Sequence, residues 1–296
     1  MNGGFSAEQL GRRLARAKAL QRGQGEYVPE PTRDSSTIAL LRDGAEGPEV
    51  FLMRRRSSMK FAAHMHVYPG GAVEPDDARV PVRLGTDPEA LAARLTTSDP
   101  VVLVAAAARE TFEESGVLLA VDAEGVPVAG GETLDALRRQ LRDEEIPFSE
   151  LLVSHGLWVD GASIVAFDHW VTPEVADFRY DTRFFAARLP EGQEAAEHGG
   201  EADSVGWWRP DDALADLEAG NVGMLAPTKG AMRRLAGFSS VDELLAAAAG
   251  YDIVPVLMHP TVVEEKMVWS RIHGVTREKI TVKHAPLWRP PTRGEA

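Results

Sequence analysis

Apolar and polar positions along this chain divide into short runs with the pattern of strands and longer runs with the pattern of helices. Strands are predicted at 37–41, 50–54, 157–167, 179–189 and 204–208. Helices are predicted at 6–20, 88–95, 100–116, 134–141, 211–217, 228–235 and 241–248. Because strands and helices are interspersed, we expect one α/β or α+β domain.

Two of the predicted helices have clear start signals. Asp87-Pro88 and Asp99-Pro100 each place an N-cap acid before a proline in the first helical position. The second of these helices is expected to end at Gly116, because glycine suits the position that follows a helix.

Turn residues predict the connections and the domain division. Asp43-Gly44 and Gly47-Pro48 indicate a hairpin between the first two strands, and Tyr68-Pro69-Gly70-Gly71 indicates a loop. We divide the chain into an N-terminal helix and linker (1–34), one domain (35–250) and a C-terminal extension that packs on the domain (251–296).

Composition narrows the possible functions. The 296 residues include 45 acidic and 32 basic side chains, and the net charge of −13 disfavours nucleic acid because its phosphates would be repelled. The absence of cysteine excludes disulfides, thiolate zinc sites and thiol catalysis. No membrane span or targeting segment stands out, so we expect a cytoplasmic protein without membrane contact.

Three glutamates gather on one face of the helix at 100–116. At about 100° per residue, Glu113 and Glu114 lie about 60° and about 40° to either side of Glu110. These like charges repel one another, and the negative end of the helix adds to the cost. Such a face is either solvated or binds a hard cation such as Mg²⁺ or Mn²⁺, and the spacing alone leaves both alternatives open.

The context of these glutamates resembles a known motif. The run Arg109-Glu-Thr-Phe-Glu-Glu-Ser-Gly-Val117 is similar to the second half of the Nudix box, G-x5-E-x7-R-E-U-x-E-E-x-G-U, where U is bulky and apolar. Gly71 and Asp77 match its first half, with aspartate in place of glutamate. Because 31 residues (78–108) replace the seven between the halves, we place an insertion at 78–98 within a box at 71–117.

An interrupted box resembles the Nudix motif 19-like branch, which contains coenzyme A diphosphatases. Segments 51–56, 66–71 and 179–185 resemble the same branch. The resemblance implies the Nudix fold, a mixed β-sheet between helices. It implies a metal-dependent hydrolase that cleaves the diphosphate linkage of a nucleoside diphosphate derivative. Coenzyme A or acyl-coenzyme A is the substrate it favours. The alternatives are an ADP-ribose- or NADH-type pyrophosphatase and a non-catalytic nucleotide-binding domain.

The resemblance also implies roles for the residues of the box. Glu110, Glu113 and Glu114 would be catalytic and would bind Mg²⁺ or Mn²⁺. Arg109 would orient these carboxylates by pairing with the earlier box acid, Asp77, for which Glu74 is the alternative.

A further catalytic acid is expected on a later loop, before a strand that bears tryptophan. Glu201, six residues before Trp207, fits this placement best, and Glu197 and Asp203 are alternatives. The carboxylate that accepts the proton of the attacking water is then Glu113, Glu114 or Glu201, a choice that stays open.

Substrate contacts are expected at two places. Arg54, Arg55 and Arg56, after the second strand, could reach a phosphate, and Arg54 and Arg56 are the expected contacts. Gly70 and Gly71 would line the substrate and supply a carbonyl to the metal. Arg179 and Arg183 share a strand with Asp181, where ion pairs alone explain them. The N-terminal helix and the tail can cover a homodimer interface, line the pocket or pack on the domain, and the sequence does not choose.

Overall fold

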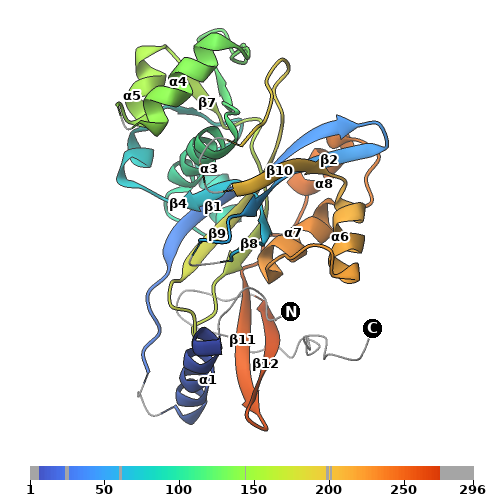
Figure 1. Ribbon diagram of the computed structural model, residues 1–296. Helices are drawn as coiled ribbons and strands as arrows, with labels where there is room; N and C mark the ends of the chain where they lie inside the picture. The colour runs from blue at the N-terminus through green and yellow to red at the C-terminus, as the bar shows by residue number, and fades with distance from the viewer. Residues whose placement is uncertain are drawn as a thin grey trace.

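The structure is a computed structural model that describes residues 7–23, 27–59, 62–143, 145–197, 200 and 202–273. A mixed β-sheet forms its centre (Figure 1), and β1–β9 and β8–β11 are its parallel pairs. The strands follow the order β10 (Ala202–Trp208), β2 (Gly47–Arg55), β1 (Arg33–Gly44), β9 (Tyr180–Arg188), β8 (Val165–Val171), β11 (Val256–Val263) and β12 (Lys266–His273), with β3 (His66–Val67) on β2 and β4 (Gly70–Ala72) on β1.

Helices cover both faces of this sheet, and each face has its own apolar core. α3 (Pro100–Ser115) packs on one face, where Ile38, Phe51 and Phe185 point. The other face, where Leu41 and Leu52 point, is covered by α6 (Pro210–Ala219), α7 (Ala226–Leu235) and α8 (Val241–Ala249). The mixed sheet between helices confirms the α+β class expected from the sequence.

A small lobe lies beside α3 and includes part of the insertion. Its three-stranded sheet has the order β5 (Val82–Arg83), β7 (Trp158–Asp160), β6 (Ala120–Val121). Figure 1 shows α4 (Glu132–Arg142) and α5 (Phe148–Ser154) against this sheet. The insertion begins within the 3₁₀ turn η1 (Pro75–Arg79) and also supplies α2 (Pro88–Leu95).

The ends of α3 follow the sequence signals. The Asp99 carboxylate accepts the Val102 N–H at 3.4 Å, Pro100 starts the helix, and Gly116 ends it in the left-handed conformation with φ +74°. Val104, Ala108 and Phe112 point into the core, whereas Val101 is only half-buried. None of the described helices is by itself long and apolar enough to cross a membrane; α2 and α3 pass that test only together, at 78° to each other.

Three predicted segments are wrong in extent. Residues 157–167 form two strands in different sheets, β7 and β8, because the backbone turns after Asp160, whose carbonyl accepts the Ser163 N–H at 3.1 Å. The loop predicted at 68–71 overlaps the first two residues of β4, since a glycine backbone can still pair with a neighbouring strand. The linker predicted to reach 34 stops earlier, since the polar residues Arg33–Ser36 already pair with β9.

The C-terminal extension adds strands that the sequence pattern did not predict. β11 and β12 form a hairpin, β11 joins β8 at Val256 and Leu257, and α1 (Ala7–Arg22) packs against β11. Pro260 weakens the strand signal, but it lies where β11 has β12 as its only partner strand among the described residues. The described part of the extension is therefore continuous with the main sheet.

Candidate functional site

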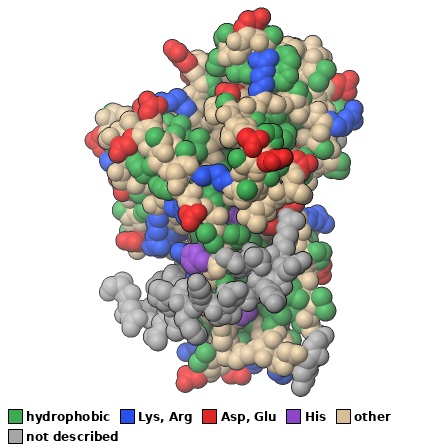
Figure 2. All heavy atoms as spheres, turned by 180° about the vertical axis from the view of Figure 1, so that it is seen from behind, with side chains coloured by type: hydrophobic (Ala, Val, Ile, Leu, Met, Phe, Trp, Pro, Cys, Tyr) green, Lys and Arg blue, Asp and Glu red, His purple; other side chains and the backbone are tan. Residues whose placement is uncertain are grey.

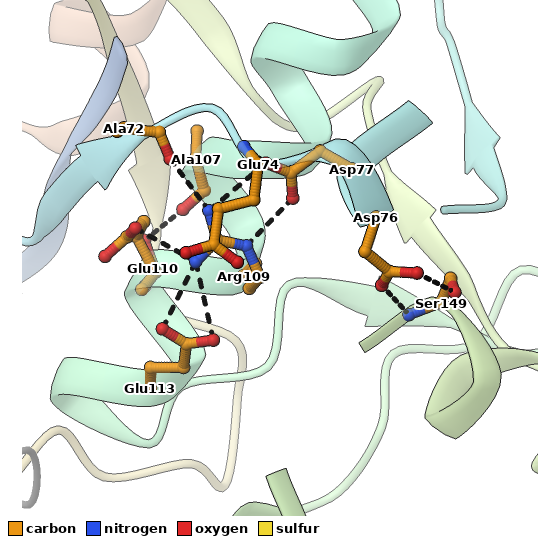
Figure 3. Close-up of polar contacts among 10 residues, drawn as sticks. Ala72, Glu74, Asp76, Asp77, Ala107, Arg109, Glu110, Glu113 and Ser149 are labelled. Atoms are coloured by element: carbon orange, nitrogen blue, oxygen red, sulfur yellow. Dashed lines mark hydrogen bonds and ion pairs between the residues drawn. The ribbon is translucent and has the colours of Figure 1, made fainter. Parts of the chain in front are cut away.

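An ion pair joins the two halves of the interrupted motif. Arg109, on α3, is 4% exposed, and its guanidinium contacts both carboxylate oxygens of Asp77 on η1, at 2.8 and 3.1 Å (Figure 3). A third bond runs from Arg109 Nη2 to the Ala72 carbonyl at 3.0 Å. The expected pairing with Asp77 is therefore present, because η1 and α3 pack against each other although the insertion separates them in sequence.

Glu110 lies between this arginine and the glycine strand β4. Its Oε1 accepts a hydrogen bond from Arg109 Nη1 at 2.9 Å. A Cβ atom on Gly71 would approach the same oxygen to 2.3 Å, so a larger residue there would push the carboxylate out of this position. Burial raises the pKa of Glu110 to about 7, and the charge of Glu113 adds to the rise while Arg109 opposes it.

Glu113 and Glu114 occupy the last turn of α3 and differ in exposure. The Glu113 side chain is 33% exposed and lies 3.3 Å from Arg109 Nη1; burial raises its pKa, which Arg109 counteracts. Glu114 is 9% exposed and accepts the Gly70 N–H at 2.9 Å. The structure thus brings the three box glutamates, Arg109 and the glycine pair together around one end of α3.

The charges of this cluster suit a divalent cation. Asp77, Glu110 and Glu113 contact a single arginine, so three carboxylates meet one positive charge, and Glu114 adds a fourth carboxylate on the same turn of α3 as Glu113. Among the described residues, no three acids or histidines are already arranged as a metal-binding group. The donor set nevertheless fits Mg²⁺ or Mn²⁺, because these ions prefer carboxylate oxygens and would offset the raised pKa of Glu110.

The loop after β9 borders the same end of α3. The Ala196 N–H donates to the Ser115 carbonyl at 3.0 Å, and the Gln193 amide bonds both backbone groups of Leu118. Glu197, an alternative to Glu201, accepts the Gly200 N–H at 2.7 Å within this loop. Glu201 itself lies outside the described residues.

The three arginines at the end of β2 point to different faces of the sheet. Phe51 and Met53 belong to the core beneath α3, so by strand alternation Arg55 faces α3 and Arg54 faces away. Arg54 pairs in register with His66 and lies 3.4 Å from His64 Nδ1, whereas Arg56 donates to the Ala202 carbonyl at 3.3 Å.

Of the three arginines that the sequence pointed to, Arg55 is therefore the one on the face of α3. Its strand neighbour Ala202 belongs to the core beneath α3, and the loop that α3 anchors at Ala196 leads into Ala202. Strand alternation could have distinguished it from Arg54 in the sequence, had the facing of Phe51 and Met53 been known.

Several aromatic, histidine and arginine side chains away from the carboxylate cluster stabilise the fold. Tyr68 and Trp170 are 4% and 3% exposed in the second core, so neither offers a free ring for stacking. His66 packs edge-on against Trp208. The ion pair expected between Arg183 and Asp181 is present at 2.9 Å.

Comparisons with known proteins agree with this arrangement. Residues 82–235, just over half of the chain, match the family described as the NUDT19 Nudix domain. The chain is 25% identical over 234 residues to the acyl-coenzyme A diphosphatase NUDT19 of Xenopus laevis, covering 66% of this chain and 62% of that protein. It is 24% identical over 242 residues to the protein of the same name from Gallus gallus, covering 66% and 63%.

A solved structure supports the fold. The crystal structure of a NUDIX hydrolase from Alicyclobacillus acidocaldarius is 27% identical with a TM-score of 0.64, and the match covers 73% of this chain and 96% of that chain. The present chain spans less than two thirds of the length of the two curated relatives it matches.

Proposed function

Because the chain belongs to the NUDT19 Nudix domain family, we propose that it is a metal-dependent diphosphatase acting on coenzyme A or acyl-coenzyme A. The observation that carries the proposal is the carboxylate cluster at the end of α3, which retains every acid of the box around the buried Arg109–Asp77 pair. The relatives named acyl-coenzyme A diphosphatase support the choice of substrate.

Glu110, Glu113 and Glu114 would hold Mg²⁺ or Mn²⁺. When bound, the ion would neutralise charge on the diphosphate and make an attacking water more acidic. Arg109 holds Glu110 and Glu113 in place by hydrogen bonds, and Asp77 holds Arg109. The Arg109–Asp77 pair is buried, so water does not compete for its hydrogen bonds.

The substrate would enter from the side where β2 ends. Arg55, on the α3 face, is the proposed phosphate contact, and Arg54 and Arg56 would then have no direct part in binding. A box glutamate or an acid of the loop at 197–203 would accept the proton of the attacking water. A cytoplasmic location and a homodimer stay predictions.

Product analysis tests this function. Purified protein is incubated with Mg²⁺ or Mn²⁺ and, separately, coenzyme A, acetyl-coenzyme A, ADP-ribose and NADH. We expect 3′,5′-ADP and the matching phosphopantetheine from the first two substrates. Turnover of ADP-ribose or NADH alone would refute the substrate assignment.

Variants of the box test the site separately. Glu113→Gln with Glu114→Gln is expected to lower turnover by about 100-fold or more, as for the loss of groups that act in the transition state. Glu150→Gln, an exposed glutamate on α5, is the control and is expected to retain full turnover. Unchanged turnover in the double variant would place the active site elsewhere.

A further inference from the structure

The segment Arg179–Phe185 resembles the same family, yet none of the contacts described for its residues reaches the carboxylate cluster. One of its residues, Arg183, lies in a row of directly opposed residues that crosses four strands: Gly71 on β4, Ser36 on β1, Arg183 on β9 and His169 on β8. Ile38 and Phe185, two positions along their strands, point into the core beneath α3, so this row faces α3. One end of the row is the glycine on which the Glu110 carboxylate rests.

Arg183 is completely buried and binds groups from three parts of the chain. Its Nη1 lies 2.9 Å from Asp181 Oδ1 and 3.1 Å from Asp34 Oδ1. Its Nε and Nη2 donate to the carbonyls of Leu95 and Thr96, each at 3.2 Å. His169 Nε2 contacts the same Asp181 carboxylate and orients it. Desolvating an arginine is costly, and these partners compensate for it.

The two carbonyls belong to the turn that leads into α3. Leu95 ends α2, and Thr96 follows in the left-handed conformation with φ +52°, which is unfavourable for a β-branched residue. Asp99, three residues later, is the N-cap of α3. Arg183 therefore holds the start of α3 on the sheet. Gly71, at one end of the same row of residues, contacts Glu110 near the other end of α3.

We propose that Arg183 is a positioning residue that holds the α2–α3 turn on the sheet, so that α3 places Glu110 against Gly71. The insertion then has a role, since the end of its last helix and the turn after it supply the carbonyls through which Arg183 acts. This inference rests on the proposed function for its effect on turnover, but not for its effect on the position of α3.

The test compares Arg183→Met, Arg183→Lys and Arg179→Met. Arg179 lies in the same segment and also donates to carbonyls, those of Thr172 and Glu30, but its described hydrogen bonds reach neither α2 nor α3. For Arg183→Met we expect faster amide hydrogen exchange at 97–110 and unchanged exchange at 184–187. Arg179→Met should match the wild type at 97–110.

Kinetics provide the second readout. A displacement of about 1 Å can cost about 100-fold in rate, so we expect Arg183→Met to lower kcat by about 10- to 100-fold with KM changed by less than about threefold. Lysine retains the charge but cannot reach all of these acceptors, so Arg183→Lys should recover part of the loss. Arg179→Met should retain kcat.

A double variant separates positioning from general loss of stability. Gly71→Ala pushes the Glu110 carboxylate away from β4, so both changes displace the same contact. Their effects on kcat should therefore be non-additive, whereas Gly71→Ala and Arg179→Met should add.

Two outcomes would overturn the inference: exchange at 97–110 that matches Arg179→Met, or additive effects of Arg183→Met and Gly71→Ala. If the wild type turns over none of the four substrates, the proposed function fails, and the exchange data alone decide whether Arg183 positions α3.

Discussion

At the scale of single residues, strand alternation distinguishes neighbouring arginines of equal charge. Arg54 and Arg55 are consecutive on β2, yet only Arg55 shares the face of Met53 and the box helix. The sequence marked the arginine cluster, but it could not show which member faces the site, because both faces of β2 are buried and its apolar run has no alternation to read.

The two arginines therefore predict different kinetics. A hydrogen bond to a charged group contributes about 1.5–3 kcal/mol, so Arg55→Met should lower kcat/KM for coenzyme A by about 10- to 100-fold. Arg54→Met, the matched control, should change it by less than about threefold because its side chain lies on the opposite face. Steady-state kinetics at fixed Mn²⁺ measure both, and equal losses would contradict the assignment.

At the scale of elements, the C-terminal end of α3 is held from outside the helix. Gly116 was expected from the sequence as a helix-ending residue, and its φ of +74° agrees. The structure adds a second constraint, since a Cβ on Gly116 would meet the guanidinium of Arg138 on α4 at 2.0 Å. The lobe thus packs directly behind the box glutamates. No local sequence pattern predicts this contact between Arg138 and Gly116.

This second constraint predicts that two similar glycines differ. Gly220 ends α6 with φ +77°, and a Cβ atom there would meet no described heavy atom within 4 Å, so Gly220→Ala should cost only the left-handed strain, about 1–2 kcal/mol. Gly116→Ala should lower the free energy of unfolding by about 1–3 kcal/mol more, since it must also displace Arg138. Urea unfolding measures the difference; equal losses would show that Arg138 moves away without cost.

At the scale of the whole molecule, the net charge of −13 has both a general and a local consequence. On the coloured part of the face in Figure 2, acidic and basic side chains are interspersed and no extended basic patch is visible. Locally, part of the acid is buried at the end of α3, where Glu110 stays protonated to a higher pH than an ordinary glutamate because burial raises its pKa.

The stability of the metal-free protein should therefore depend on Glu110 and pH. Below about pH 4.5 the residue is protonated in both states and contributes nothing; as the pH rises from 4.5 to about 7, the pKa in the folded state, only the unfolded state ionises it, which favours unfolding. Glu110→Gln should thus be increasingly more stable than the wild type between about pH 5 and about pH 8, by up to roughly 3 kcal/mol.

Urea unfolding in EDTA at several pH values measures this difference. Glu150→Gln, with its exposed carboxylate, is the control, and its difference from the wild type should stay constant. A difference for Glu110→Gln that does not change with pH would contradict the raised pKa.

Local sequence signals were sufficient to predict the ends of α3 and the face that carries its glutamates. Asp99-Pro100 marks the start of α3 and Gly116 marks its end. The helical period places Glu110, Glu113 and Glu114 on one face. The sequence shows both because caps and periodicity act within a few residues. Only the tertiary structure decided the rest. The pairing of Arg109 with Asp77 across 31 residues, the facing of Arg55 and the burial of Arg183 depend on segments distant in sequence. Each is a contact between elements, and its free energy exists only once the sheet and helices have packed.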